Sequence, residues 1–217
     1  RIDPARASPE VTAGASAAGG DTTYLCVVDQ WGNAVSHIQS LGSRFGSGVV
    51  AGRTGVLLND RMQGWHLNPG HPNALMPGKR VRHTMNPPMA FRDGKLFLVF
   101  GTPGGDTQVQ TNMHVLSGIV DFRMTPQEAV EAPRWHHLQH GTIPDGYGRT
   151  DTDEDRLIIE DRYPDSVKDA LRARGHVLSV EPAWADWGSA QAIMVDPVTG
   201  VLMGAADPRR DAYAVGW

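Results

Sequence analysis

The chain has 217 residues, of which 40% are hydrophobic and 20% charged, a composition typical of a globular protein with a substantial core. The formal net charge of −4 at pH 7 gives no reason to expect nucleic acid or an anionic membrane surface as a partner. The single cysteine, Cys26, excludes an internal disulfide and a cysteine-based metal cage, and no apolar run approaches the roughly 20 residues that span a bilayer.

The composition changes abruptly at Asp21. Residues 1–21 are dominated by Ala, Gly, Ser, Pro and Thr, which bury little apolar surface, so we expect a flexible tail there. Residues 22–217 carry the strand and helix patterns of a folded domain. The chain begins at Arg1 rather than Met, so we expect an upstream region, and the cellular location is left open.

Paired strands come first in the folded part. Residues 22–29 and 34–41 are rich in β-branched side chains and flank a Gly-Asn turn, which predicts a hairpin. Residues 89–92 and 95–100 predict a second hairpin, joined by the tight turn Asp93-Gly94.

The segment between the two hairpins is less regular. Residues 49–51 and 55–59 are strand-like, and residues 60–88 predict a long loop. Loops of this length are usually functional.

Two helices follow the second hairpin. Asp106 or Thr107 can cap the first helix. Apolar residues recur along it at spacings of four, three and four, which predicts a face turned toward the core: Val109, Met113, Leu116 and Val120. The second helix begins with a capping box at residues 125–128, with proline at its first position, and extends to about Ala132.

The last third of the chain alternates between irregular segments and short elements. Residues 135–137 fall in an irregular stretch, residues 164–174 predict a helix closed by Gly175, and four segments predict strands: 157–159, 177–180, 190–196 and 201–205. Because the long helices can cover a sheet face, we expect a layered α+β sandwich.

A glycine-rich motif, Gly101-Thr102-Pro103-Gly104-Gly105, lies where a strand hands over to a helix. Backbone N–H groups at such a position suit an oxyanion, whereas the alternative is a tight turn that merely uses glycine. The Gly-Lys-Ser/Thr ending of a phosphate-binding loop is absent.

Two other kinds of site are disfavoured. The histidine cluster His136, His137 and His140 matches no zinc spacing, so surface or hydrogen-bonding histidines are the better interpretation, and we expect neither a metal nor another cofactor. No Gly-x-Ser-x-Gly elbow follows a strand, which argues against a serine triad.

Thr22 raises a different chemistry. Its simplest interpretation is a β-branched residue in a strand. A threonine hydroxyl can also act as a nucleophile when its own free α-amino group is the base, which requires that the threonine be the first residue of its chain. Thr22 starts a strand directly behind a glycine-rich leader, the arrangement that self-cleaving N-terminal-nucleophile hydrolases need.

The sequence resembles the small subunit of the γ-glutamyltranspeptidases over residues 22–217. Collinear motifs carry the resemblance: Thr22-Thr23, Val27-Val28-Asp29, Gly32-Asn33-Ala34-Val35, residues 45–52, Gly55-Val56-Leu57-Leu58-Asn59, Pro77-Gly78-Lys79-Arg80, residues 101–105, residues 128–134 and Ala206-Asp207-Pro208-Arg209.

The resemblance implies a four-layer αββα sandwich, made by self-cleavage of a precursor between Asp21 and Thr22. Residues 1–21 would then be the tail of the large-subunit region and residues 22–217 the small-subunit catalytic domain, paired with the large subunit. Thr22 would be the nucleophile and Ser40, where the family has threonine, would hydrogen-bond it. Gly104 and Gly105 would form the oxyanion hole, which agrees with the strand–helix argument above.

The sequence departs from the family where the glutamyl group is held. Gly42 and Gly64 replace the asparagine and aspartate that bind the α-amino group, and Arg61 replaces a glutamine. His83-Thr84 replace the serine pair that binds the α-carboxylate. Losing two polar anchors for an ammonium group should cost several kcal/mol, at about 1.5–3 kcal/mol for each hydrogen bond to a charge.

Three functions therefore stay open. The family resemblance implies a γ-glutamyltransferase or glutathione hydrolase acting on small amide or γ-glutamyl substrates. The missing anchors favour a non-glutamyl acylase, similar to the cephalosporin and glutaryl acylases, in which Arg61, His83 and Thr84 would bind a carboxylate on the substrate. The third is a homologue that does not self-cleave and serves as a binding or structural protein.

Overall fold

The computed structural model describes residues 22–138, 156–185 and 187–217. The predicted tail 1–21, including Asp21, and His140 lie outside these residues. The strands are β1 (Thr22–Val28), β2 (Ala34–Ser40), β3 (Met89–Arg92), β4 (Lys95–Gly101), β5 (Trp135–Leu138), β6 (Arg156–Glu160), β7 (Leu178–Glu181), β8 (Gln191–Val195) and β9 (Leu202–Ala206). The helices are α1 (Gln108–Val120), α2 (Pro126–Glu131) and α3 (Asp165–Ala173), with 3₁₀ turns at Arg61–Gly64 and Gly105–Thr107.

The predicted first hairpin is confirmed. β1 pairs antiparallel with β2 in a register that sets Thr22 opposite Ser40. The turn closes on Asp29, whose carboxylate accepts hydrogen bonds from the backbone N–H groups of Trp31 and Asn33 and from the Asn33 side chain. These hydrogen bonds hold the pKa of Asp29 below its usual value.

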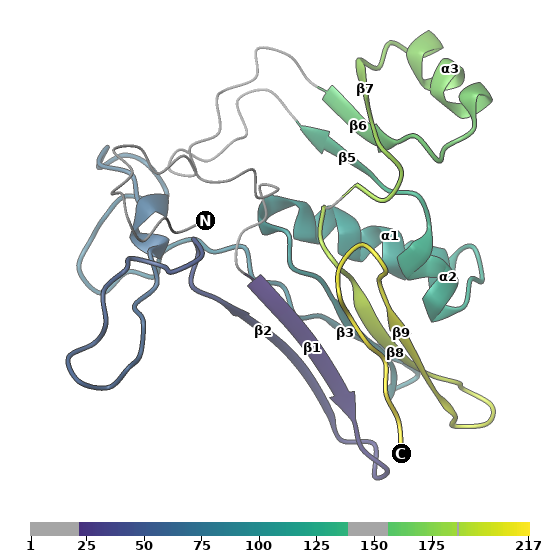
Figure 1. The fold of residues 1–217 in the computed structure, drawn as a ribbon, viewed down its shortest axis with the longest axis horizontal. Coiled ribbons are helices and arrows are strands. Elements are labelled where there is room, and N and C mark those ends of the chain that lie inside the picture. Colours follow the sequence, from purple (N-terminus) through teal and green to yellow (C-terminus); the bar gives the residue numbers. More distant parts are fainter. Residues whose placement is uncertain (1–21, 139–155, 186) are drawn as a thin grey trace, which may run out of the picture.

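The core lies between the four-stranded sheet and the helices. The strand order is β3-β4-β8-β9, all antiparallel, and α1 and α2 cover one face of the sheet (Figure 1). The buried cluster on that face joins Leu98 and Phe100 of β4 with Val115 and Ile119 of α1 and Val130 of α2. Each such side chain stabilises the fold by about 1.5–3 kcal/mol on burial.

The β1–β2 hairpin packs on the opposite face of this sheet. Alternate residues of a strand point to opposite faces, so Gly101 points away from the face that carries Leu98 and Phe100. A Cβ atom on Gly101 would lie 2.3 Å from the ring of Tyr24, so only glycine lets the hairpin approach this closely. The hairpin, the four-stranded sheet and helices α1 and α2 thus form two sheet layers and one helical layer, and the predicted α+β class is confirmed.

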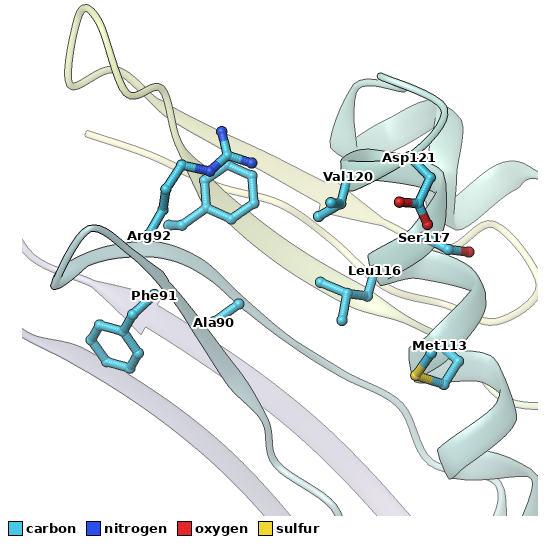
Figure 2. A pocket seen from close by; sticks show the side chains of 9 residues that line it. Ala90, Phe91, Arg92, Met113, Leu116, Ser117, Val120 and Asp121 are labelled. Carbon is cyan, nitrogen blue, oxygen red and sulfur yellow. The ribbon is translucent and has the colours of Figure 1, made fainter.

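The predicted inner face of the first helix is wrong for Val109, Met113 and Val120, while Leu116 packs against the core as predicted. Val109 and Met113 are each 56% exposed, and the buried face of α1 carries Gln108, Thr111, Asn112, Val115, Gly118 and Ile119. Met113 and Val120, together with the partly buried Leu116, line a surface pocket of about 350 Å³ against β3 (Figure 2). The spacing identified a helix correctly, but polar residues occupy half of its buried side because they hydrogen-bond a neighbouring loop.

The start of α2 matches its prediction. The Thr125 hydroxyl accepts the backbone N–H of Glu128, and the Glu128 carboxylate accepts the backbone N–H of Thr125. This reciprocal capping box satisfies two of the donors that a helix start leaves open. It also lowers the pKa of Glu128.

A third sheet, with strand order β5-β6-β7, corrects the predicted irregular stretch at residues 135–137. Those residues form β5, which pairs antiparallel with β6. His136 is buried and His137 is exposed, as expected of neighbours in a strand, but two identical residues show no alternation of apolar and polar side chains in the sequence. The chain then passes through α3 to β7, parallel to β6, and this unit lies on the far side of α1 and α2 from the hairpin (Figure 1).

The strand-like segments at residues 49–51 and 55–59 amount to a single bridge, Val50 to Leu57. The long loop at 60–88 is confirmed apart from the turn Arg61–Gly64 and one bridge from His66 to Ala74. None of the helices described here is long and apolar enough to cross a membrane.

Candidate active site

Thr22 and Ser40 form the centre of the site. Their opposed positions at one end of the hairpin bring the two hydroxyls together, and Thr22 Oγ1 lies 3.0 Å from Ser40 Oγ, within hydrogen-bond distance. Both side chains are partly buried. The predicted pairing of these residues is therefore present in the geometry, while the roles assigned to them stay predictions.

Two further donors converge on the Ser40 oxygen. The backbone N–H of Gly42 lies 3.1 Å from Ser40 Oγ, and Arg61 Nη2 lies 2.7 Å from the same atom. Neither a backbone N–H nor a guanidinium can accept a hydrogen bond, so Ser40 Oγ is the acceptor in both contacts. The side chain of Ser40 is thus held from two sides besides Thr22.

Arg61 links this pair to the segment that carries Thr84. It opens the 3₁₀ turn after β2, its backbone N–H donates to Asn59 Oδ1, and its side chain is buried. Arg61 Nη1 lies 3.4 Å from Thr84 Oγ1. Of the three predicted substrate-binding residues, the structure therefore brings Arg61 and Thr84 together beside Ser40. His83 is exposed and its Nδ1 accepts the N–H of Met85.

The polar face of α1 anchors the Thr84 segment. The backbone N–H of Asn86 donates to the buried side chain of Gln108 at 3.1 Å, and Asn112 donates to the carbonyl of Asn86 at 3.4 Å. On the other side of Thr84, Arg82 forms a 2.5 Å ion pair with Asp106. Sequence reasoning missed these supports because they join segments 22 to 26 residues apart in the chain.

Gly104 and Gly105 form the turn between β4 and α1. Their φ angles are +138° and +57°, in the region that favours glycine. A Cβ atom on Gly104 would lie 2.9 Å from the carbonyl oxygen of Trp187. Since Tyr24 packs on Gly101, the end of β4 lies beside the start of β1, and the turn is at the same end of the sheets as Thr22 (Figure 1).

The predicted capping role of Thr107 is corrected. Thr107 stands at the N-cap position of α1, but its hydroxyl makes no capping hydrogen bond. Its Oγ1 lies instead 2.8 Å from the Gly104 carbonyl oxygen and 3.1 Å from that of Trp187, so one proton is shared between the two. Both contacts stabilise the turn that contains Gly104 and Gly105, so the Thr107 side chain supports this turn rather than capping α1.

The two positions that lack ammonium anchors differ in their surroundings. A Cβ atom on Gly42 would lie 1.9 Å from Asp60 Oδ1, so the Asp60 carboxylate fills the space of a residue-42 side chain. Asp60 is held there by the N–H of Ser43 and the side chain of Gln63. At Gly64, which is buried, a built Cβ atom would make ordinary van der Waals contacts, the nearest with Val81 at 3.5 Å. The approach of Asp60 to Gly42 has no signal in the sequence.

Two members of the predicted histidine cluster, His136 and His137, point to opposite faces of β5. His136 packs edge-on against Trp187 at 4.6 Å between ring centroids. Within the ranges that the structure describes, His, Cys, Asp and Glu form no group of three suited to a metal ion.

Comparison with known proteins decides the family. The family model described as gamma-glutamyltranspeptidase matches residues 1–217. The chain belongs to the gamma-glutamyltranspeptidase family. A curated family member, the glutathione hydrolase-like YwrD proenzyme of Bacillus subtilis, is 42% identical over 200 residues, which is 91% of this chain and 36% of the relative. The chain thus spans about a third of the length of such relatives.

Solved structures agree. The gamma-glutamyltranspeptidase of Pseudomonas nitroreducens, complexed with L-DON, superposes with a TM-score of 0.72 at 34% identity, over 90% of this chain and 99% of that one. The cephalosporin acylase of Bacillus halodurans gives a TM-score of 0.75 at 37% identity, over 89% of this chain and 34% of that one. The expected sandwich of the N-terminal-nucleophile hydrolases is thereby confirmed as the fold of this family member.

Proposed function

We propose that the protein is an amide hydrolase or acyltransferase of the gamma-glutamyltranspeptidase family, with Thr22 as its nucleophile. In this proposal, cleavage between Asp21 and Thr22 frees the α-amino group of Thr22 and separates a large subunit that stays bound. The supporting observation is the 3.0 Å contact of the Thr22 and Ser40 hydroxyls at the first residue of β1. The names of the curated relatives, glutathione hydrolase proenzymes among them, agree with a precursor.

The chemistry follows from the groups at this end of the sheets. Thr22 Oγ1 attacks the amide carbonyl carbon while its proton passes to the free α-amine, whose ordinary pKa near 8 suits a base at neutral pH. The backbone N–H groups of Gly104 and Gly105 hold the oxyanion of the tetrahedral intermediate. The ammonium returns the proton to the leaving amine, and the remaining acyl ester is transferred to water or to an amine.

The γ-glutamyl group is the substrate that the family resemblance favours, and the site offers a reason for a different acyl group. Gly42 and Gly64 supply no side chain for an α-ammonium, and the buried guanidinium of Arg61 would repel one. A non-glutamyl acylase is the second candidate, in line with the likeness to a cephalosporin acylase. In it, His83 and Thr84 would face the carboxylate of an acidic acyl chain such as glutaryl, and Arg61 stands behind Thr84 with its terminal nitrogens on protein hydroxyls.

Processing of the full-length polypeptide tests the nucleophile. We expect the wild-type protein to yield two bands on a denaturing gel, with Thr22 as the N-terminal residue of the smaller. Thr22→Ala should give one band and no turnover. Thr23→Ala is the matched control, because Thr23 is exposed on the other face of β1 and should process normally. A wild-type protein that stays whole and inert would instead be the binding or structural homologue.

Two p-nitroanilides separate the substrate candidates. The glutamyl and glutaryl compounds differ by the α-ammonium group, so the ratio of their kcat/KM values measures recognition of that charge. We expect the glutaryl compound to be preferred. Gly64→Asp, whose Cβ atom would meet only ordinary van der Waals contacts, should shift the ratio toward the glutamyl compound. A strong wild-type preference for the glutamyl compound would overturn the acylase candidate.

A further inference from the structure

Arg61 is a buried cation whose hydrogen bonds run to the catalytic end of the hairpin. Its side chain is 8% exposed, with Nη2 at 2.7 Å from Ser40 Oγ and Nη1 at 3.4 Å from Thr84 Oγ1. Taking a guanidinium out of water is costly, so contacts made by such a group are expected to matter. Both terminal nitrogens of Arg61 donate to protein hydroxyls, so these two contacts are internal.

The contact with Ser40 restricts a side chain that would otherwise rotate. A β-branched threonine has a stiff χ1, whereas serine at this position has no branch. Arg61 and the Gly42 N–H occupy the acceptor side of Ser40 Oγ and so hold the side chain in the rotamer that meets Thr22. A charged donor on this oxygen also polarises the Ser40 O–H bond, since hydrogen bonds in a chain strengthen one another.

We propose that Arg61 is a positioning residue that holds and polarises Ser40 against the nucleophile, so that both self-cleavage and acyl transfer depend on it. This inference rests on the proposed role of Thr22. As Thr22 Oγ1 loses its proton, the Ser40 hydroxyl turns to donate to it, and the positive charge behind Ser40 favours this step. Through Thr84, the same guanidinium ties the segment held by α1 to the nucleophile.

Arg61→Gln and Arg61→Lys, made in the full-length protein, test this role. For Arg61→Gln we expect the self-cleavage rate and kcat on glutaryl-p-nitroanilide to fall about 10- to 100-fold, the range for losing one charged hydrogen bond. KM should change little, because the lost contact is internal. Arg61→Lys should recover part of kcat, since it keeps the charge without the planar fork. Arg172→Gln, on exposed α3, is the control and should match wild type.

A double-mutant cycle with Ser40→Ala shows whether Arg61 acts through Ser40. If it does, Arg61→Gln has little further effect on kcat in the Ser40→Ala background. If the reductions in kcat caused by Arg61→Gln and Ser40→Ala multiply in the double variant, the proposal is overturned. It is also overturned if Arg61→Gln changes only KM, which would make Arg61 a direct substrate ligand. Should Arg61→Gln fail to fold, judged by its thermal unfolding, the cycle is run with Arg61→Lys.

The same set of variants separates this inference from the proposed function. If Thr22→Ala still cleaves itself or turns over substrate, the nucleophile assignment fails. If Thr22→Ala is inactive while Arg61→Gln behaves as wild type, the nucleophile stands and the role of Arg61 is overturned.

Discussion

Replacing Asp207 by asparagine should destabilise the fold strongly, because Asp207 joins two arginines inside the protein. Its side chain is fully buried and accepts four hydrogen bonds: from Arg134 Nη2 at 2.5 Å, the Ala190 N–H at 2.9 Å, and the N–H and Nη1 of Arg209, each at 3.0 Å. Arg209 also pairs at 2.5 Å with Glu160, so one cluster ties the segment after α2 to β6 and the end of β9.

The expected loss follows from this burial. An asparagine presents an amide N–H₂ to one of the two guanidinium groups and leaves the arginines with one negative charge fewer. Removing one partner of a buried ion pair costs about 3–5 kcal/mol. With m values of about 1–3 kcal/mol per molar urea, the unfolding midpoint should fall by at least about 1 M.

Urea unfolding followed by circular dichroism measures this shift. Asp169→Asn is the control, because Asp169 pairs with Arg172 on the exposed side of α3 and such pairs contribute about 0–1 kcal/mol. We expect its midpoint to stay close to wild type. If Asp207→Asn shifted the midpoint no more than Asp169→Asn does, the cluster would not be the structural link inferred here.

Three further outcomes are expected. Gly104→Ala should lower kcat about 100-fold, because its Cβ atom would meet the Trp187 carbonyl and displace the turn. Gly105→Ala should lower kcat less, because its Cβ atom would meet open space. Equal losses of kcat in the two variants would contradict this. Burial, aided by Arg134, lowers the pKa of His114 from 6.5 to about 4. The unfolded state therefore binds the proton at higher pH than the folded state does, and the free energy of unfolding should fall by up to about 3 kcal/mol as pH drops from 6.5 to 4. Urea titrations across this range should show that the free energy of unfolding of His114→Gln depends less on pH. Burial raises the pKa of Cys26 to about 11, so iodoacetamide at pH 8 should label the unfolded protein far faster than the folded one; equal rates would refute this.

Local features of the chain predicted much of the fold. The hairpin turn at Asp29, the capping box at Thr125 and the helix closed by Gly175 each depend on residues a few positions apart. The hydrogen bonds of such features join neighbouring residues, so the turn or helix cap forms largely independently of its tertiary surroundings. The pairing of Thr22 with Ser40 belongs here too, because hairpin register follows from the turn.

The tertiary structure decided what these elements face. The apolar stripe of Met113 and Val120 predicted a buried helix face, but the sheet covers the neighbouring side of α1, where Gln108 and Asn112 serve the Thr84 segment. Apolar spacing predicts that a segment forms an amphipathic helix, but the tertiary packing decides which side of the helix is buried.

The sequence by itself predicted the family, placed Thr22 at the start of a strand and located the diglycine turn. It could not place Asp60 in the space beside Gly42, or Arg61 on Ser40 and Thr84, because these contacts join loop residues 18 to 23 positions apart. No periodic pattern encodes such contacts, since they depend on how the long loop folds back over the hairpin. The proposed nucleophile could therefore be predicted from the chain, whereas its surroundings could be seen only in the fold.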